Sequence, residues 1–364
     1  MSIFRNLFLL EDRAIKKIML DRQGKKWKNI VKSYGPFKGV LSSQEIKEAE
    51  EFWRPFAGSR IDPLFHAWYK KSTGVFHPEI VPEDIWYTKI DYYFNDRETA
   101  KRVDNKCLYD YFFSNVNLPI NICKRISGLW FSENMVLNGV AEAAAIASQY
   151  DSVFLKIANG SCGGKGVFFL SGKEIPEKIK ELNGTIENDI VIQKPIIQHE
   201  ALGRLSPSSV NTLRVLSLLR SEGVNIYSVI LRMGIDGSKV DNVSSGGITC
   251  GVTEEGRLKP VAYSARGDSY SQHPTTNVKF DEIVIPNYKK VLQNTKMLAM
   301  HFPMFRMVSW DWTVDETGEP LLVEANLYNG ALDFHQLNNG PIFKSDTNMV
   351  LSEVFGKRKA DKTT

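Results

Sequence analysis

The stretch from Phe154 to Phe168 constrains the fold of this 364-residue chain more than any other segment. An apolar run that carries Lys156 leads into a turn with glycines at 160, 163, 164 and 166, and a second apolar run follows. Because glycine adopts conformations that a Cβ forbids, the pattern predicts a strand over 152–157, a glycine-rich loop and a returning strand over 167–170. Backbone N–H groups of such a loop bind phosphate oxygens, and a lysine at the strand end adds a positive charge. The alternative is a flexible hairpin that binds nothing.

The order of these residues excludes two common phosphate-binding loops. Lys156 precedes the glycines, whereas the lysine of a protein kinase follows them, and no GK[ST] sequence opens a helix as in a Walker A loop. The net charge of +4 is too small for a protein that binds nucleic acid through charge, so we expect no nucleic-acid partner. The four cysteines, at 107, 123, 162 and 250, have no CxxC spacing, and reduced thiols are typical of a cytoplasmic protein.

A second group of polar residues lies within 305–326. The runs 305–314 and 320–325 predict two strands joined by a tight turn. Asp311 lies in the first strand, and Glu324 and Asn326 share strand parity in the second, so the three side chains can fall on one face. Carboxylate and amide oxygens are hard ligands that suit Mg²⁺. A solvent-facing polar row is the alternative, but bulky apolar neighbours surround Asp311, and a buried carboxylate needs partners.

Two arginines occur at or within apolar strands. Asn211 and Arg214 stand at the start of the predicted strand 212–220, and Arg232 lies within the predicted strand 225–233. A buried arginine needs an anion, and a phosphate group undergoing transfer is a suitable one. An internal salt bridge is an equally good explanation of Arg232.

The rest of the sequence predicts a mixed α+β protein with helices near its N-terminus. Apolar residues recur with helical, one-sided spacing over 3–19, and the first forty residues hold ten Lys or Arg against three acids, a net charge of +7. Such a helix either rests on an anionic membrane surface or docks on the protein with a solvated basic face. Aromatic residues crowd 52–94, where we expect core or an inter-domain seam and not a sugar or base platform. Further elements are expected as helices over 42–71, 106–113 and 287–301, and as a strand over 190–193.

Taken in order along the chain, these features resemble the ATP-grasp superfamily. The order is a lysine before the first sheet, a strand lysine, a glycine-rich loop, a hinge strand, an N-T-x-R segment, and then an aspartate and a Glu-x-Asn on a hairpin. Five segments resemble more closely the sugar-transfer-associated, glutamate-ligase-related ATP-grasp family: 104–106, 210–214, 241–247, 273–274 and 285–286. The resemblance covers about residues 75–350.

The resemblance implies an α+β ATP-grasp fold, in which two α+β subdomains clamp ATP and a mainly helical region precedes them. The helical, aromatic-rich region with its basic first helix is expected over 1–100. The first subdomain, with the glycine-rich loop, is expected over 101–193, and the second, with the metal site, over 194–350. A basic tail over 351–364 would complete the chain.

The resemblance also implies roles for individual residues. One or two Mg²⁺ ions, with Mn²⁺ as a substitute, would bind to Asp311, Glu324 and Asn326, with Glu324 bridging. Arg214 would hold the γ-phosphate or an acyl phosphate. Many members of the superfamily have an arginine two residues after the metal-binding Asn, where this chain has Tyr328, so Arg232 or Arg266 would have to replace it. His273 is a candidate substrate-loop residue, although a lone histidine is more often structural. Contacts to ATP would come from the linker, the strand, the loop, the hinge and the N-T-x-R segment, through Lys106, Lys156, Gly160, Ser161, Gly163, Gly164, Lys165, Gly166, Gln193, Lys194, Ile196, His199 and Asn211.

The implied activity is ATP-dependent ligation of a carboxylate to an amine through an acyl phosphate. The expected substrates are small molecules or glycans of surface polysaccharide or glycan-modification biosynthesis. Two alternatives are an ATP-grasp phosphotransferase, which is a kinase, and a non-catalytic nucleotide-binding scaffold of a glycan-assembly complex. The presence of two carboxylates at the metal positions disfavours the scaffold. We expect a cytoplasmic protein whose basic helix is a candidate contact to the inner face of the membrane.

Overall fold

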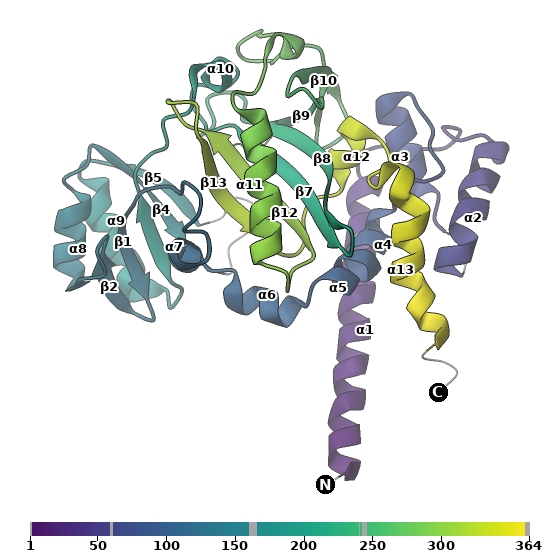
Figure 1. Cartoon of the computed structure of the whole chain (residues 1–364), viewed down its shortest axis with the longest axis horizontal. Helices are drawn as coiled ribbons and strands as arrows, with labels where there is room; N and C mark the ends of the chain where they lie inside the picture. The colour runs from purple at the N-terminus through teal and green to yellow at the C-terminus, as the bar shows by residue number, and fades with distance from the viewer. Residues whose placement is uncertain (1, 59–60, 160–165, 240, 242–245, 361–364) are drawn as a thin grey trace. The chain divides into compact units, whose positions relative to one another are not determined.

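The computed structural model describes residues 2–58, 61–159, 166–239, 241 and 246–360, with side chains from residue 16 to residue 356 (Figure 1). The chain divides into two compact units. The first contains Met1–Asn95, Arg266–Ser269 and Ala331–Thr364, and the second contains Asp96–Ala265 and Tyr270–Gly330. The sequence-based division instead assigns residues 331–350 to the second subdomain.

The first unit is helical. Its longest helix is α1. Helix α2 begins with a capping box, in which the hydroxyl of Ser42 accepts from the N–H of Glu45 (3.2 Å) and the carboxylate of Glu45 accepts from the N–H of Ser42 (2.8 Å). Helix α13 includes most of the predicted basic tail. The helices and turns are α1 (Ser2–Lys32), α2 (Ser43–Ala57), α3 (Leu64–Thr73), α4 (Glu83–Ile85), the π-helical turn η1 (Trp86–Ile90), α5 (Asp91–Phe94), α12 (Asp333–Asn339), the 3-10 turn η5 (Lys344–Asp346) and α13 (Thr347–Ala360).

Aromatic side chains from 52–94 form the core of the first unit. Trp53, Trp68 and Trp86 are buried, and the indole N–H of Trp53 donates to the carbonyl oxygens of Pro78 and Ile80, both at 3.1 Å. Burial of large rings with satisfied polar atoms is typical of a packed core. The expectation of core, and not of a binding platform, is therefore confirmed for these residues.

Helix α1 docks on the first unit through its C-terminal half. Val31 is buried, and the ring of Trp27 stacks on that of Tyr87 with 4.4 Å between centroids. For this half of the helix, the structure shows docking on the protein, which is one of the two arrangements that the sequence allowed. Of the stretch 3–19, in which the sequence shows one-sided spacing, the side chains of residues 3–15 lie outside the described part of the chain.

The second unit contains two antiparallel sheets. The smaller sheet has the strand order β3-β2-β1-β6-β4-β5. Its strands are β1 (Asn121–Ile126), β2 (Leu129–Ser132), β3 (Leu137–Asn138), β4 (Ser152–Ile157), β5 (Val167–Ser171) and β6 (Ile190–Gln193). Helices α8 (Val140–Ala147) and α9 (Glu174–Thr185) pack against each other and against this sheet.

The larger sheet has the order β11-β10-β9-β8-β7-β12-β13. Its strands are β7 (Thr212–Arg220), β8 (Gly223–Met233), β9 (Ile248–Val252), β10 (Leu258–Ser264), β11 (Ser269–Tyr270), β12 (Met307–Val314) and β13 (Pro320–Asn326). Figure 1 shows α11 (Tyr288–His301) running across one face of this sheet, where it contacts β7, β8 and β12. The short helical elements of this unit are α6 (Arg97–Val103), η2 (Lys106–Leu108), α7 (Tyr109–Phe112), α10 (Glu200–Gly203) and η4 (Phe280–Glu282).

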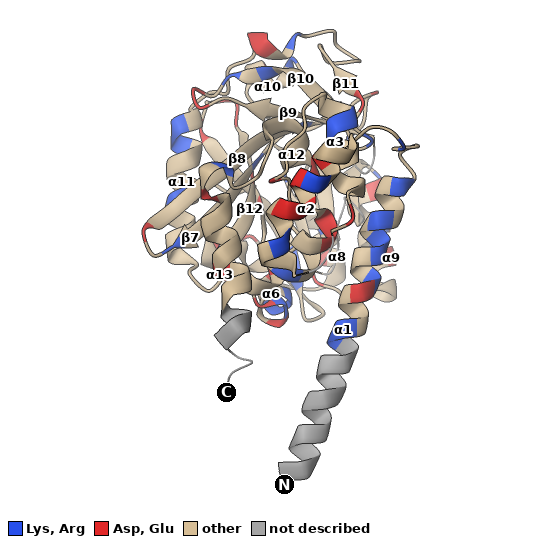
Figure 2. Ribbon diagram, turned by 90° about the vertical axis from the view of Figure 1, so that its right-hand side faces the viewer, with Lys and Arg blue, Asp and Glu red and all other residues tan. Residues whose placement is uncertain are grey.

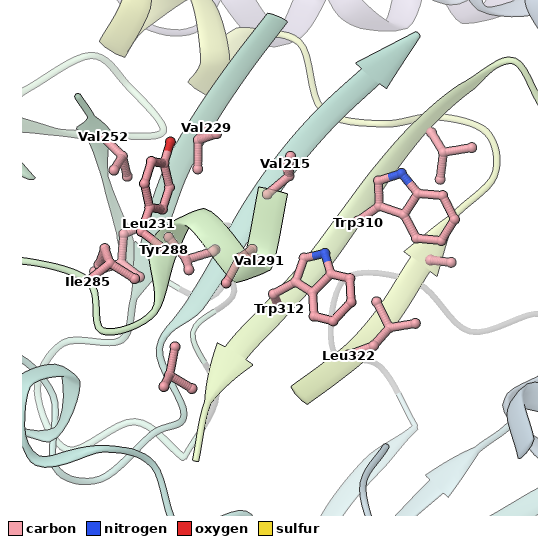
Figure 3. Close-up of a cluster of buried hydrophobic side chains, with 14 of the residues drawn as sticks. Val215, Val229, Leu231, Val252, Ile285, Tyr288, Val291, Trp310, Trp312 and Leu322 are labelled. Carbon is pink, nitrogen blue, oxygen red and sulfur yellow. The ribbon is translucent and has the colours of Figure 1, made fainter. Parts of the chain in front are cut away.

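The face of the larger sheet under α11 is apolar. Trp310, Trp312 and Val215 lie in this core together with Val291 of α11 (Figure 3). Asp311 lies between the two tryptophans in β12 and Arg214 precedes Val215 in β7, so strand alternation directs both charged side chains to the opposite face.

A β-bulge between β12 and β13 adjusts which residues share a face. Asp311 pairs with Glu324, but the next residue, Trp312, pairs with Leu322, so one extra residue of β13 bulges out. The apolar Leu322 therefore reaches the core, whereas Glu324 lies with Asp311. Bulges of this kind are frequent beside functional sites because they redirect a side chain.

The strands and the helix expected at 152–157, 167–170, 190–193, 212–220, 225–233, 320–325 and 287–301 are confirmed as β4, β5, β6, β7, β8, β13 and α11, and the strand expected from residue 305 begins at Met307. The α+β class, with two sheet-centred parts and a helical N-terminal region, is likewise confirmed. Cys107, Cys123 and Cys250 are buried free thiols. Among the helices that the structure describes, none combines the length and apolar character needed to cross a bilayer.

Candidate functional site

The register of the larger sheet gathers the predicted site residues on neighbouring strands. Asp311 of β12 faces Arg214 of β7 on one side and Glu324 of β13 on the other. Thr212, two residues before Arg214, faces Arg232 of β8. Since β7 and β12 are distant in sequence, this register is what brings both arginines to the carboxylates.

Asp311 is the centre of an ion-pair network. The guanidinium of Arg214 donates to both carboxylate oxygens, from Nε to Oδ1 (2.8 Å) and from Nη2 to Oδ2 (2.7 Å). Arg232 donates from Nη1 to the same Oδ2 (2.8 Å), and the amide nitrogen of Asn326 lies 3.3 Å from it. Burial by itself would raise the pKa of Asp311, but the two guanidinium groups outweigh it and lower that pKa.

Arg232 bridges Asp311 to a second carboxylate that sequence reasoning did not assign. Its Nη2 donates to Asp241 Oδ1 at 3.0 Å, and the hydroxyl of Thr212 donates to the other oxygen of Asp241. Burial raises the pKa of Asp241 against the opposing effect of Arg232. Arg232 therefore forms the internal salt bridge that the sequence left open, and it does so at the site.

Lys106 reaches strand β13 from the segment before the smaller sheet. Its ammonium donates to Glu324 Oε1 at 2.7 Å. The backbone N–H of Lys106 donates to the carbonyl of Ala158 (3.0 Å), just after β4, and the N–H of Ala325 donates to the hydroxyl of Tyr109 (3.1 Å). These bonds fix η2 and α7 between the end of β4 and the strand that carries Glu324. Sequence reasoning missed Tyr109, because an aromatic residue in a short helix has no distinctive pattern.

Lys156 differs from the other cations of the site. Within the part of the chain that the structure describes, its ammonium forms no ion pair and lies 5.9 Å from the centroid of the Phe154 ring. Burial, followed by the positive charge of Lys106, lowers the pKa of Lys156 to about 8. A buried ammonium without a partner is costly, so this position favours an anionic ligand.

The donor set fits a magnesium ion in its chemistry. Asp311 and Glu324 are adjacent carboxylates on paired strands, and the side chain of Asn326 reaches Asp311. These are the hard oxygen ligands that Mg²⁺ prefers. Because Arg214, Arg232 and Asn326 already donate to Asp311, a metal ion would have to displace at least one of these donors. The groups of three or more His, Cys, Asp or Glu that mark an all-side-chain metal site are absent from the described residues.

The predicted hinge connects the two sheets, as expected for 193–199. Gln193 ends β6, and its amide nitrogen donates to Asn121 Oδ1 (2.9 Å). The N–H of Lys194 donates to the carbonyl of Ile120 (3.0 Å), and its ammonium lies 5.1 Å from the ring of Tyr150. Ile196 follows in the segment between β6 and α10 and is half-buried.

Two predicted contacts to ATP have local structural partners. His199 caps α10, with Nδ1 accepting from the N–H of Ala201 (3.1 Å). The amide nitrogen of Asn211 is held by the side chain of Gln198 (3.0 Å) and by the carbonyl of Leu202 (2.8 Å). Both residues therefore shape the loop before β7, and neither belongs to the network around Asp311.

His273 occupies a structural position. It is buried, its Nε2 lies 3.0 Å from the carbonyl of Gly234, and its Nδ1 accepts from the N–H groups of Thr275 (3.3 Å) and Thr276 (3.4 Å). Both ring nitrogens serve the loop itself, so we leave His273 out of the proposed chemistry.

The glycine-rich loop is described at its end alone. Contacts to ATP are predicted for Gly160, Ser161, Gly163, Gly164 and Lys165, which lie outside the described residues. Gly166 has φ +78°, and a Cβ there would lie 2.8 Å from the side chain of Ile157. Its carbonyl accepts from the N–H of Ile157 (2.8 Å), so Gly166 closes the β4–β5 hairpin, in which glycine is required.

Two antiparallel sheets joined by a hinge, with lysines on one and paired carboxylates on the other, define the ATP-grasp class. The family model of sugar-transfer-associated ATP-grasp proteins matches residues 88–351, which is more than half of the chain. The chain belongs to this family.

Other comparisons are more distant. No curated protein shows significant sequence similarity to the chain. Similar solved structures include the ADP complex of purK, an N5-carboxyaminoimidazole ribonucleotide synthetase (14% identical, covering 63% of this chain and 45% of that chain, TM-score 0.38). D-alanyl-alanine synthetase A from Vibrio cholerae O1 biovar eltor str. N16961 is 11% identical over 70% of this chain and 65% of that chain (TM-score 0.41), and D-cycloserine synthetase DcsG is 9% identical over 73% of each (TM-score 0.44). The chain thus spans less than two thirds of the first two, and the likeness is too distant to transfer an activity.

Proposed function

We propose that the chain is an ATP-dependent ligase that joins a carboxylate to an amine. One observation carries the proposal: Lys156 is half-buried, and its ammonium has no ion-pair partner among the described residues, beside the Lys106–Glu324 and Arg214–Asp311 pairs. The cluster holds four cations, Lys106, Lys156, Arg214 and Arg232, and four carboxylates, Asp104, Asp241, Asp311 and Glu324. Because the ammonium of Lys156 forms no ion pair within the described residues, it is available to a ligand with negative charge, such as the phosphates of ATP.

The proposed reaction has two steps. A carboxylate oxygen of the first substrate attacks the γ-phosphorus of ATP, the bond to the bridging oxygen breaks, and ADP leaves with that electron pair. The amine nitrogen of the second substrate then attacks the acyl carbon, phosphate leaves, and the nitrogen loses a proton to give an amide. Lys156 and Arg214 would stabilise the negative charge on the transferred group, because fixed cations in a water-poor site act strongly on a developing charge.

Magnesium, when bound, would neutralise charge on the β- and γ-phosphates. Asp311, Glu324 and Asn326 are the residues that would hold it. In the same complex Arg214 would exchange its bidentate contact with Asp311 for the phosphate, since planar guanidinium matches both anions. Arg232 would stay with Asp241, which gives it a second anchor when Asp311 turns to the metal.

We further propose substrates from glycan modification, for example a sugar acid as the carboxylate and an amino compound as the amine. The support is the description of the family, which associates these proteins with sugar transfer. Small-molecule substrates are also consistent with a site built from side chains of one chain.

The test is release of ADP from Mg·ATP in a screen of uronic acids against amino acids and amino sugars, with hydroxylamine as a trap. The ligase account expects ADP release that depends on a carboxylate and, with hydroxylamine, a hydroxamate of that carboxylate. A phosphorylated product that resists hydroxylamine would identify a phosphotransferase instead. ATP binding without turnover over the whole screen would favour the scaffold.

A further inference from the structure

The outer face of helix α1 is a surface without a partner in the first unit. We define it by the residues Ile18, Met19, Arg22, Lys25, Lys26 and Lys32, all of which are exposed. Ile18, Arg22, Lys25, Asn29 and Lys32 follow a spacing of four and three residues, which places them in one line along a helix. Met19 and Lys26 lie beside that line.

The opposite side of the same helix is the docked side. Gly24, Trp27 and Val31 follow the same spacing on the other face. Val31 is buried, Trp27 stacks on Tyr87, and a Cβ at Gly24 would lie 3.6 Å from the Cβ of Asp84. Because the docked side fixes the rotation of α1, the outer face is turned away from the helices that support it.

The C-terminal half of helix α1 is strongly basic. Residues 16–32 hold seven Lys or Arg and a single acid, Asp21, for a net charge of +6 (Figure 2). Lys28 is used internally, in ion pairs with Asp84 (3.1 Å) and Asp62 (3.5 Å), and Lys16 lies over the ring of Tyr92. Within the described residues, the four cations of the outer face form no ion pair.

Two large apolar side chains lie among these cations. The exposed fractions are 53% for Ile18 and 57% for Met19. A nucleic acid or an acidic protein loop would match the charge but would leave this apolar pair in water. The surface of an anionic bilayer matches both, since phospholipid headgroups attract the cations and the acyl boundary accepts apolar side chains.

We propose that the outer face of α1 docks on the surface of a membrane that contains anionic phospholipids. The helix lies on the bilayer and does not cross it, because no described helix is apolar enough to span it. The cations then contact headgroups while Ile18 and Met19 enter the interfacial layer. This proposal does not depend on the reaction at the ATP-grasp site.

The test is co-sedimentation of the full chain with vesicles of phosphatidylcholine alone or with 30% phosphatidylserine, a composition of about one anionic lipid in three. Binding to the mixed vesicles, and not to phosphatidylcholine alone, is expected at low salt, and it should weaken as salt is added. Each cation near such a surface strengthens binding roughly fivefold, so replacing Arg22, Lys25, Lys26 and Lys32 by Gln should weaken it at least about tenfold.

A matched variant controls for net charge. Replacing Lys173, Lys180, Lys289 and Lys296, which are exposed elsewhere, by Gln removes the same four charges and should leave vesicle binding within about twofold. Thermal unfolding of both variants checks that they fold. Ile18→Gln with Met19→Gln should further reduce the binding that persists at high salt.

Any of three results would overturn the proposal. The first is that the wild type fails to bind the mixed vesicles. The second is that the outer-face variant binds them as well as the wild type does, and the third is that the matched variant loses as much binding as the outer-face variant. A different result would assign the face to nucleic acid instead. In that case single-stranded RNA would compete with the vesicles for the chain, and Ile18→Gln with Met19→Gln would not change vesicle binding.

Discussion

In the larger sheet Arg214 and Arg232 each face a carboxylate, whereas the smaller sheet presents Lys156 with no ion pair among the described residues. The paired arginines are satisfied by the protein itself and help to hold strands together. Burial and the positive charge of Lys106 lower the pKa of Lys156, and the carboxylates of Glu324 and Asp241 oppose this lowering only in part. The difference indicates that one sheet supplies a preformed frame and the other supplies the charge that the ligand must satisfy.

Removing the central carboxylate should cause the largest loss. Asp311→Asn would leave Arg214 and Arg232 buried without their shared anion, and breaking a buried pair in this way costs about 3–5 kcal/mol in the free energy of unfolding. Urea unfolding monitored by circular dichroism measures it. Glu319→Gln, in the turn between β12 and β13, removes an exposed partner of Lys290 of α11 and should cost less than about 1 kcal/mol. Equal effects of the two changes on the free energy of unfolding would show that the ion pairs of Asp311 do not stabilise the larger sheet.

Glu324→Gln should separate activity from folding. The side chain of Glu324 is 31% exposed, so losing its charge should cost less in the free energy of unfolding than Asp311→Asn does, although Lys106 loses its partner. Magnesium-dependent turnover, however, should fall at least about 100-fold, because a metal contributes several kcal/mol of charge stabilisation. The measurement is ADP release with the substrate pair found in the screen. Activity near that of the wild type would remove Glu324 from the metal site.

Lys156→Ala should weaken nucleotide binding without lowering stability, whereas Asp311→Asn should mainly lower stability. Affinity for Mg·ATP should fall by about 1.5–3 kcal/mol, the scale of a charged hydrogen bond, while the stability of the protein is kept or raised. Nucleotide titration and thermal unfolding measure the two quantities. Lys180→Ala, an exposed lysine of the same subdomain, should change neither. An unchanged affinity in Lys156→Ala would mean that the phosphates bind elsewhere.

The lowered pKa of Lys156 predicts a smaller effect of pH. Its ammonium is mostly charged at pH 7 and loses its proton as the pH rises through about 8. Binding of Mg·ATP should therefore weaken up to about tenfold between pH 7 and pH 9, since each pKa unit corresponds to a tenfold change in affinity. In Lys156→Arg, whose guanidinium stays charged, this dependence should be absent. A wild type whose affinity is flat over this range would contradict the assignment.

The sequence predicted the elements of the site better than its contacts. Apolar runs and the turn between them indicated β12 and β13, and alternation was enough to bring Asp311, Glu324 and Asn326 to one face. The bidentate contact of Arg214 with Asp311 was not predicted, because it depends on the register between β7 and β12, which are separated by more than eighty residues. The pairing of β7 with β8 places Thr212 opposite Arg232, and Asp241, which follows β8, reaches both side chains.

The polar residues of loops were the least predictable. His199 and Asn211 were singled out by the resemblance to ATP-grasp proteins, and His273 as a substrate-loop candidate. Each is engaged by nearby backbone or side-chain groups, and their roles toward ligands stay predictions. Side chains of this kind satisfy local backbone groups as readily as they bind ligands, and the sequence alone does not distinguish the two uses.

The most direct test of the account is a calorimetric titration of the full chain with ATP, with magnesium and then with EDTA, for the wild type and for Lys156→Ala. The account predicts saturable binding of one nucleotide per chain that requires magnesium and weakens in the variant. Absence of binding by a folded wild type, or equal binding by both proteins, would contradict the claim that the unpaired lysine and the paired carboxylates form one nucleotide site.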